Sequence, residues 1–384
     1  MKLGIVGGGQ LARMLALAAH PLGVRVQTLC ASQDEPAGRV ARAIVGSGDS
    51  LSDLRGLAHD SDVLTFETES LDAGLLRAAC ETKPMYPPVR ALEIAQDRLL
   101  EKLFLRELGI PLAPFVPIDT RDDLERAVAT LVLPAVLKTR RGGYDGKGQV
   151  VLRDDRDAIT LWTRLAGRPL VLEAFVQFER ELSLVAVRSR EGEIRFYPLV
   201  ENFHAGGVLR ATIAPASGID VSVERLAQGY ARRIMESLDY VGVLALELFE
   251  LGDELWANEV APRVHNSGHW TIDGAQTSQF ENHVRAVCGL PLGSTKARCH
   301  AAMLNLLGTV PDIESLLAVL GAHVHLYDKP AAPGRKLGHV TLCAPDRATL
   351  FEPLARALEI VERDGSDLNR RLAIDEWTLS NSPA

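Results

Sequence analysis

Residues 142–149 read Gly-Gly-Tyr-Asp-Gly-Lys-Gly-Gln, and Lys138 precedes this stretch by four residues. Its four glycines in seven positions disfavour a helix or a strand interior, because glycine loses more backbone freedom on folding than other residues. A glycine-rich loop instead lets backbone N–H groups approach an anion closely. The apolar run at 132–137 predicts a strand that delivers Lys138. A strand, a lysine and a glycine-rich loop indicate a site for nucleotide phosphates, although the chain has no Walker A sequence.

The composition is that of an ordinary globular protein. The chain has 384 residues, of which 47% are hydrophobic and 24% charged, so we expect two or three domains. A net charge of −8 argues against a nucleic-acid partner. We expect no secretory signal, no membrane association and a cytoplasmic location, because Lys2 is followed at once by a glycine-rich turn and no apolar run could span a bilayer. The five cysteines are scattered, which argues for reduced thiols and against zinc.

Hydrophobic periodicity predicts alternating strands and helices, and therefore an α/β fold. The chain opens with a strand, a glycine turn, a helix and a second strand, which is a βαβ unit. The predicted strands cover 1–6, 23–29, 44–45, 63–66, 150–152, 170–175, 182–188, 194–199, 243–249 and 254–259, with two more within 115–138. The predicted helices cover 10–20, 91–108, 222–238 and 347–361, with another beginning near 121.

The first turn, Gly7-Gly8-Gly9-Gln10-Leu11-Ala12, fits the pattern G-x-G-x-x-[GA]. A dinucleotide-binding turn also needs an acidic residue at the end of the second strand. That strand ends in Leu29-Cys30-Ala31, and Asp34 and Glu35 lie beyond it. Three interpretations stay open: a tight structural turn, a phosphate bound at the helix N-terminus, or a nicotinamide dinucleotide.

Two carboxylates interrupt neighbouring apolar strands. Glu247 lies within Leu-Ala-Leu-Glu-Leu-Phe, and Glu259 follows Leu-Trp-Ala-Asn, of which the last residue is Asn258. A carboxylate inside an apolar strand is costly unless it is paired or bound to a cation. Two such carboxylates with Asn258 would suit Mg²⁺, which shares the phosphate oxygens of a nucleotide. The alternative is a buried ion pair with lysine or arginine.

Residues 263–270 read Arg-Val-His-Asn-Ser-Gly-His-Trp, a segment dense in hydrogen-bond donors. Its place directly after the carboxylate strand predicts an anionic substrate. The alternative is that His265 and His269 only satisfy local hydrogen bonds. A second cationic loop would suit a phosphate monoester or would simply be a solvated surface. It contains Lys329, Arg335, Lys336 and His339.

Residues 173–176, Glu-Ala-Phe-Val, end a predicted strand. Such a segment can read an adenine edge through backbone hydrogen bonds while the carboxylate holds a ribose. No Ser/His/Asp triad, activated cysteine or zinc cluster stands out, so covalent catalysis by an enzyme nucleophile is not expected.

Taken together, these segments resemble the N5-carboxyaminoimidazole ribonucleotide synthase family of ATP-grasp ligases. The run Glu-Val-Ala-Pro-Arg-Val-His-Asn-Ser-Gly-His-Trp-Thr at 259–271 is the most specific part of the resemblance. Further matching stretches extend it over nearly the whole chain; they lie at 4–14, 138–149, 178–183, 200–204, 277–281, 305–308 and 334–340. Three positions depart from the common pattern: Ala12, Asp328 and Ala332.

The resemblance implies a three-domain ATP-grasp fold. The expected parts are a Rossmann-like N-terminal domain at 1–108, a lid domain with the glycine-rich loop at 109–172, and a grasp domain at 173–384 with a small C-terminal subdomain. It also implies carboxylation of 5-aminoimidazole ribonucleotide with ATP and bicarbonate, through carboxyphosphate, in purine biosynthesis. ATP and Mg²⁺ are the implied cofactors, and a homodimer is the implied assembly.

Matching positions imply roles for individual residues. Those expected around ATP are Arg98, Lys138, Gly143, Tyr144, Asp145, Gly146, Lys147, Gly148, Gln149, Glu173, Ala174, Phe175, Val176, Glu181, His204, Asn258 and Glu259. Those expected to hold Mg²⁺ are Glu247 and Glu259. Those expected to bind the ribonucleotide or bicarbonate are Gly8, Gly9, Gln10, Leu11, Arg263, His265, Asn266, Lys329, Arg335 and Lys336. The implied catalytic residues are Arg263, Lys138, Tyr144, Asp145 and Lys147.

Three other functions stay open. Another ATP-grasp ligase would share the nucleotide half of the site but not the segment at 263–270. A nicotinamide-dependent oxidoreductase would use the glycine turn at 7–12. A non-catalytic nucleotide-sensing module would bind ATP without reaction, and the assembled set of catalytic residue types argues against it.

Overall fold

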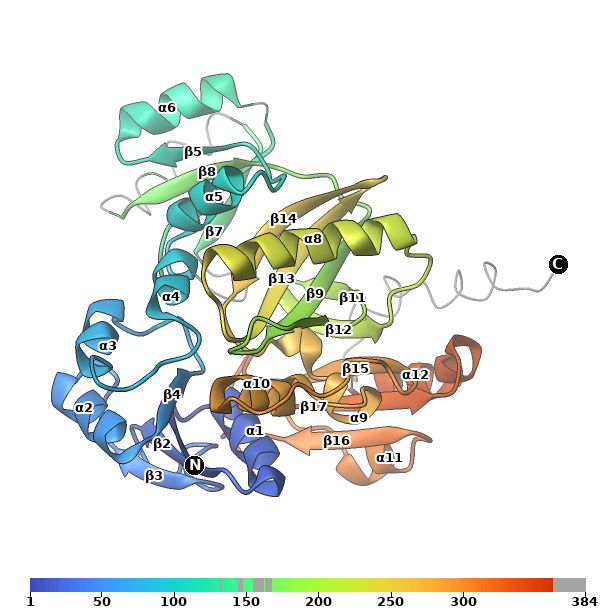
Figure 1. The fold of residues 1–384 in the computed structure, drawn as a ribbon. Coiled ribbons are helices and arrows are strands. Elements are labelled where there is room, and N and C mark those ends of the chain that lie inside the picture. The colour runs from blue at the N-terminus through green and yellow to red at the C-terminus, as the bar shows by residue number, and fades with distance from the viewer. Residues whose placement is uncertain (132, 144–147, 155–161, 163–167, 362–384) are drawn as a thin grey trace.

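A computed structural model describes residues 1–384 except 132, 144–147, 155–161, 163–167 and 362–384. Within the described residues the chain builds three sheets in sequence order, each with its own helices (Figure 1). The five cysteines are free thiols, as the sequence predicted. Among the described helices, none is both long and apolar enough to cross a membrane.

The first sheet is parallel and has the strand order β3-β2-β1-β4. Its strands are β1 (Lys2–Val6), β2 (Arg25–Cys30), β3 (Arg42–Val45) and β4 (Val63–Phe66). Its helices are α1 (Gln10–Ala19), η1 (His20–Leu22), α2 (Leu51–Asp60) and α3 (Ala73–Ala79). Gly7 joins β1 to α1 with φ of 119°, a conformation that favours glycine. The predicted βαβ opening is confirmed.

The single helix predicted for 91–108 is wrong, because this stretch forms two helices, α4 (Val89–Ala95) and α5 (Arg98–Glu107). Asp97 separates them. Its carboxylate accepts hydrogen bonds from Leu99 N and Leu100 N and so caps the N-terminus of α5. The helical spacing of apolar residues continues past Asp97, so the sequence pattern does not show that one helix ends and another begins there.

The second sheet is antiparallel, with the order β5-β8-β6-β7. Its strands are β5 (Phe115–Ile118), β6 (Ala135–Thr139), β7 (Gln149–Leu152) and β8 (Leu170–Ala174). The helix α6 (Arg121–Thr130) begins with a capping box between Thr120 and Asp123. Strand β6 delivers Lys138 next to the glycine-rich segment, as predicted. The limits of the predicted domains stay a prediction, and β8 runs across the one placed at 172.

The third sheet has nine strands in the order β14-β13-β9-β11-β12-β15-β17-β16, and β10 also pairs with β9. Its strands are β9 (Arg180–Arg188), β10 (Ile194–Phe196), β11 (Val200–Ala205), β12 (Val208–Ala214), β13 (Gly242–Leu251), β14 (Glu254–Ala261), β15 (His300–Leu307), β16 (Ala322–Leu326) and β17 (Lys336–Ala344). The helices around it are α8 (Val221–Ser237), η2 (Asn266–Gly268), α9 (Thr271–Gly274), α10 (Gln279–Cys288), α11 (Ile313–Leu317) and α12 (Arg347–Val361).

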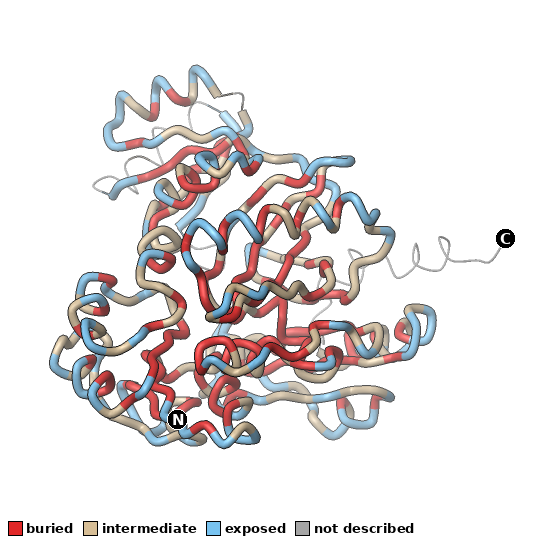
Figure 2. The backbone as a smooth tube through the Cα atoms, viewed as in Figure 1, coloured by how far each residue is buried: buried red, intermediate tan, exposed pale blue. Residues whose placement is uncertain are grey.

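Strand β13 shows how this sheet is buried on both faces. Val243 and Ala245 pack into the core that contains α10, whereas Leu244 and Leu246 pack into the core under α8. Figure 2 shows the result as buried backbone along the central strands, with exposed stretches on the outer helices. Helix α10 also contacts α1 and β4, and thereby joins the first sheet to the third.

Candidate active site

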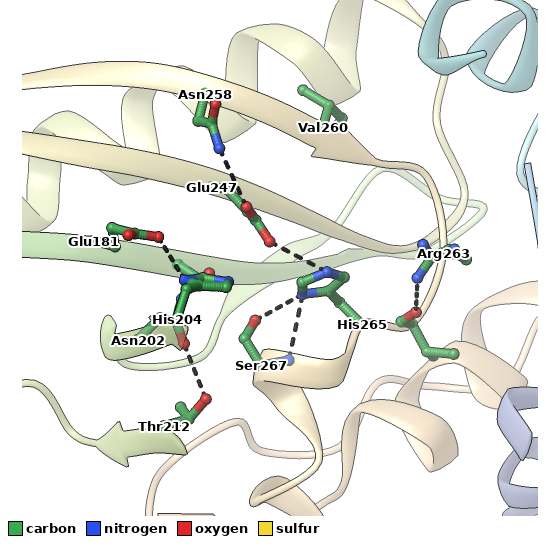
Figure 3. Close-up of polar contacts among 12 residues, drawn as sticks. Glu181, Asn202, His204, Thr212, Glu247, Asn258, Val260, Arg263, His265 and Ser267 are labelled. Carbon is green, nitrogen blue, oxygen red and sulfur yellow. Dashed lines mark hydrogen bonds and ion pairs between the residues drawn. The ribbon is translucent and has the colours of Figure 1, made fainter. Parts of the chain in front are cut away.

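The two predicted metal ligands lie opposite each other. Glu247 on β13 pairs with Glu259 on β14, at the point where the register shifts by a bulge. Burial, and then the Glu259 carboxylate, raise the pKa of Glu247 to about 7. Asn258 Nδ2 donates to Glu247 Oε2 over 3.4 Å (Figure 3). A cation between two such carboxylates would relieve their mutual repulsion.

His265 contacts this pair from the segment after β14. Its Nε2 lies 3.3 Å from Glu247 Oε1, and its Nδ1 accepts a hydrogen bond from Ser267 N (Figure 3). The proton therefore sits on Nε2 and points at the carboxylate. Burial, followed by the charge of Arg263, holds the pKa of His265 well below its usual range. Nδ1 of His265 therefore takes part in a local hydrogen bond, whereas Nε2 faces Glu247.

His204 on β11 and Glu181 on β9 form a second pair on the same sheet, with 2.5 Å between Nδ1 and Oε2. Burial alone would lower the pKa of His204, but Glu181 outweighs it and raises the pKa. Figure 3 shows this pair beside Glu247, with Asn202 bridging to Thr212 behind it. The structure thus brings Glu181, His204 and Glu247 together.

Lys138 lies in a buried ion cluster. Glu173 Oε2 accepts from Lys138 Nζ over 3.0 Å and from Lys102 Nζ of α5 over 2.9 Å. Burial alone would raise the pKa of Glu173, but the two lysines outweigh it and hold the pKa low. Glu173 Oε1 is buried and has no hydrogen-bond partner in the described part of the chain. Lys102 was missed by the sequence analysis, since a lysine inside an amphipathic helix gives no signal of burial.

Residues at the start of α5 bind the stretch of chain that leads into the glycine-rich segment. Arg98 donates to the carbonyl oxygens of Thr139 and Gly143, and Asp97 binds Arg140 through both of its oxygens. Gly148 has a φ of 76°, and the next residue, Gln149, begins β7. The predicted site residues Tyr144, Asp145, Gly146 and Lys147 lie outside the described residues.

The segment predicted to read adenine has two of its N–H groups already engaged. Ala174 N donates to Pro114 O, and Phe175 N donates to Pro134 O. Nearby, the exposed Phe178 ring stacks on Phe249 with 4.6 Å between centroids.

The glycine turn before α1 holds a carboxylate of the protein itself. Glu67, directly after β4, accepts from Gly9 N and from Ala12 N, the latter over 2.9 Å. A Cβ atom on Gly8 would lie 1.9 Å from Glu35 Oε2, and one on Gly7 would lie 2.6 Å from Glu67 Cγ. The glycines thus make room for Glu35 and Glu67, which disfavours a dinucleotide pyrophosphate here. A ligand phosphate would rely on Gln10 and Leu11 instead.

Arg263 lies between the carboxylate pair and the glycine turn. Its Nε donates to Glu69 Oε2 over 2.8 Å, and its charge interacts with both Glu259 and Glu67. The sequence analysis missed Glu67 and Glu69. Their position directly after the buried strand β4 was the available signal, because ligands bind at the carboxyl ends of parallel strands.

Asn266 is 8% exposed, and both polar atoms of its amide lack a hydrogen-bond partner within the described chain. Buried amides are nearly always paired, so an unpaired one next to His265 indicates a place for a ligand. This supports the prediction that Asn266 binds substrate.

The second cationic loop reaches both the turn and the segment at 263–270. Lys329 Nζ donates to Gln10 Oε1 over 2.6 Å, and the charge of Lys336 acts on His265. Arg335 is exposed and donates to Pro330 O within its own loop. The prediction that His339 adds a cation is wrong, because it is fully buried and its pKa is well below the usual range, through burial first.

Family models match three consecutive parts of the chain. The ribonucleotide synthetase preATP-grasp domain matches residues 1–96, the ATP-grasp domain matches 103–280, and the phosphoribosylaminoimidazole carboxylase C-terminal domain matches 301–352.

Curated and solved proteins resemble the chain over nearly its whole length. N5-carboxyaminoimidazole ribonucleotide synthase of Pseudomonas aeruginosa is 48% identical over 94% of this chain and 100% of its own. The crystal structure of the Thermus thermophilus synthetase has a TM-score of 0.90 at 51% identity, covering 94% of this chain and 98% of that one. The Aspergillus clavatus enzyme, solved with ADP and 5-aminoimidazole ribonucleotide, has a TM-score of 0.88 at 32% identity, covering 94% and 98%.

Proposed function

Because the chain belongs to the N5-carboxyaminoimidazole ribonucleotide synthase family of ATP-grasp ligases, we propose that the site just described carboxylates 5-aminoimidazole ribonucleotide. The protein is an ATP-dependent C–N ligase of purine biosynthesis, and ADP and phosphate are its other products. The further proposals concern the carbon source, the metal and the role of each residue. A homodimer and domain limits at 108 and 172 are proposed from the family resemblance, and a cytoplasmic location is proposed from the scattered cysteines.

The nucleotide lies between the second and third sheets in this proposal. Lys138 neutralises phosphate charge, since phosphoryl transfer needs positioning and charge neutralisation more than covalent help. The unpartnered Glu173 Oε1 accepts from a ribose hydroxyl or an adenine amino group. Arg98 holds the backbone from which the phosphate loop begins.

Glu247 and Glu259 would hold Mg²⁺, with Asn258 beside them. Their donor set fits this ion, because Mg²⁺ binds through one or two carboxylates and completes its coordination with water and phosphate oxygens. Among the described residues no group of three or more His, Cys, Asp or Glu side chains is placed to hold a metal. When bound, the ion would neutralise charge on the transferring phosphoryl group.

Arg263 would hold bicarbonate and the carboxyphosphate formed from it, because a guanidinium fork suits planar oxyanions. Asn266 would hydrogen-bond the same ligand or the ribonucleotide. Gln10, Leu11, Lys329 and Lys336 would surround the ribonucleotide phosphate. The exocyclic amine of the ribonucleotide then captures the activated carbon within reach of Arg263.

One observation carries the proposal above the others: Arg263 Nε donates to Glu69 Oε2 over 2.8 Å, two residues from Glu67 at the glycine turn, and its charge also acts on Glu259 of β14. The phosphoryl donor and the ribonucleotide can therefore meet at one guanidinium. A site for nucleotide binding alone would need no such junction.

The test is ADP release with ATP, Mg²⁺ and bicarbonate, measured with and without 5-aminoimidazole ribonucleotide. We expect strong stimulation by the ribonucleotide, and a loss of at least about a hundredfold in Glu259→Gln, which removes one ligand charge. Glu254→Gln is the matched control, because Glu254 is exposed on the same strand and accepts a hydrogen bond from Trp256 Nε1. Unstimulated ADP release, or equal loss in both variants, would refute the proposal.

A further inference from the structure

Three histidine rings lie one against the next below the cationic loop. The rings of His325 on β16 and His339 on β17 are stacked with 4.6 Å between centroids and 17° between planes. His269, directly after η2, lies 4.9 Å from His339 on the other side. We call His269, His339 and His325 the histidine column. It joins the end of the segment at 263–270 to the paired strands β16 and β17.

Both ends of the column are fixed by helices. His325 Nε2 lies 2.8 Å from Asp273 Oδ2 on α9. His269 Nδ1 lies 3.4 Å from Gln279 Nε2 on α10, and its ring packs against Phe280. The column therefore has a defined position relative to the segment at 263–270, which leads into α9.

Tyr327 connects the column to the cationic loop. Its hydroxyl lies 2.6 Å from His339 Nδ1, and its ring meets His269 edge-on. Tyr327 is 2% exposed, and its backbone N donates to Leu337 O across the base of the loop. His339 Nε2 has no hydrogen-bond partner among the described residues, so this hydroxyl is the polar contact of the ring there.

The loop that Tyr327 begins carries two of the cations assigned to the ribonucleotide phosphate. Lys329 reaches Gln10 at the start of α1, and the charge of Lys336 acts on His269 as well as His265. Lys329 follows Tyr327 by two residues, and Lys336 begins β17, which carries His339 three residues later.

We propose that the histidine column is a positioning element that fixes loop 327–336 through the Tyr327–His339 hydrogen bond, and thereby sets affinity and selectivity for the substrate's phosphate. The proposal rests on the proposed function. Tyr327 and His339 are positioning residues, because they act through Lys329 and Lys336. Burial keeps the pKa of both His269 and His339 well below the usual range, which leaves these two rings neutral.

The first test is Tyr327→Phe, which removes the hydroxyl and leaves His339 without a polar partner. We expect KM for 5-aminoimidazole ribonucleotide to rise about tenfold, with KM for ATP and kcat within about twofold of the parent protein. The ratio of kcat/KM for the ribonucleotide to kcat/KM for its dephosphorylated nucleoside should fall by a similar factor. A structural defect would instead lower kcat or change both KM values.

The matched control is Tyr197→Phe. The Tyr197 hydroxyl is also buried, and it donates to Thr277 O over 2.9 Å rather than to a residue of the histidine column. We expect this variant to keep the KM for the ribonucleotide. A double-mutant cycle that combines Tyr327→Phe with Lys329→Gln then tests whether Tyr327 acts through Lys329. If it does, the losses of ribonucleotide affinity in the two variants are not additive.

The outcomes separate the two proposals. If ribonucleotide does not stimulate ADP release in the parent protein, the proposed function fails. If it does, and Tyr327→Phe behaves like Tyr197→Phe or adds fully to Lys329→Gln, the column has no positioning role. If Tyr327→Phe does not fold, His339→Gln replaces it with the same expected KM shift, and an unchanged KM there refutes the inference.

Discussion

Asn266 is a residue whose surroundings serve binding better than folding. A buried amide without partners costs about 1–3 kcal/mol of folding free energy. We expect Asn266→Leu, which fills a similar volume with an apolar group, to leave the free energy of unfolding unchanged or to raise it. Ribonucleotide-stimulated ADP release should fall by at least about tenfold, because the substrate loses its amide partner. Urea denaturation and steady-state assays measure the two effects.

Asn282→Leu is the control for this prediction. The Asn282 amide is also buried, and it bonds Tyr197 Oη and both the N and O of Gly293. Its replacement should destabilise the fold by a few kcal/mol, as expected when buried hydrogen bonds are broken. Equal destabilisation by the two variants would show that Asn266 is a structural residue.

At the residue scale, motifs indicated the candidate ligands better than the residues that contact them. That Glu247 and Glu259 lie together could be predicted, because a carboxylate in an apolar strand is anomalous. The ion pair between Glu69 and Arg263 could not be predicted from the sequence, because the two residues meet only when two sheets pack together. The sequence predicts that His339 is a cation because Arg335 and Lys336 precede it, whereas β17 is buried on both faces from Leu337 to Leu342.

The break between α4 and α5 is the element on which the glycine-rich segment depends. Asp97 caps α5 and binds Arg140 at the same time. We expect Asp97→Ala to lower the free energy of unfolding by about 2–4 kcal/mol, since it loses a cap and leaves a half-buried guanidinium unpaired. KM for ATP should rise, because Arg98 and Arg140 position the start of the phosphate loop.

Asp72→Ala controls for the cap alone. Asp72 caps α3 by accepting from Leu75 N, and it lies on the surface. Its loss should cost about 1 kcal/mol and leave KM for ATP unchanged. Equal effects of the two variants in urea denaturation would mean that the Asp97–Arg140 pair adds nothing.

At the element scale, the sequence predicted those strands and helices whose pattern is local. β4 was predicted to the residue, and β13 and β14 to within a few residues. The order of the nine strands could not be predicted, because β12 pairs with β15 across more than eighty residues. Nothing in a local pattern specifies such a partner.

At the scale of the whole molecule, His283 fastens the first sheet to the third. Its Nδ1 accepts from Val243 N on β13, and its Nε2 donates to Thr65 Oγ1 on β4. Burial lowers the pKa of His283 to about 3. The unfolded chain, with an ordinary histidine pKa near 6.5, therefore binds a proton between about pH 3 and 6.5 that the folded protein does not.

The contribution of His283 to the free energy of unfolding should consequently be complete above about pH 6.5 and fall as the pH drops. The slope is up to about 1.4 kcal/mol per pH unit for each such histidine, and His269 and His339 act in the same direction. Urea denaturation from pH 5 to 8 measures this slope, and His283→Asn should make it shallower. A slope unaffected by this substitution would contradict the assignment of His283 as a neutral bridge.

The nine-stranded sheet has a practical consequence for anyone who divides this chain. Residues 301–352 match a family model of their own, yet β15 pairs with β12 from Ala211 to Ala214. A fragment that stops before β15 would leave the free N–H and C=O groups of β12 as a template for other chains. Such a fragment is expected to self-associate. Residues 301–352, which look like a separate unit in sequence, therefore protect the edge of β12 from pairing with a strand of another molecule.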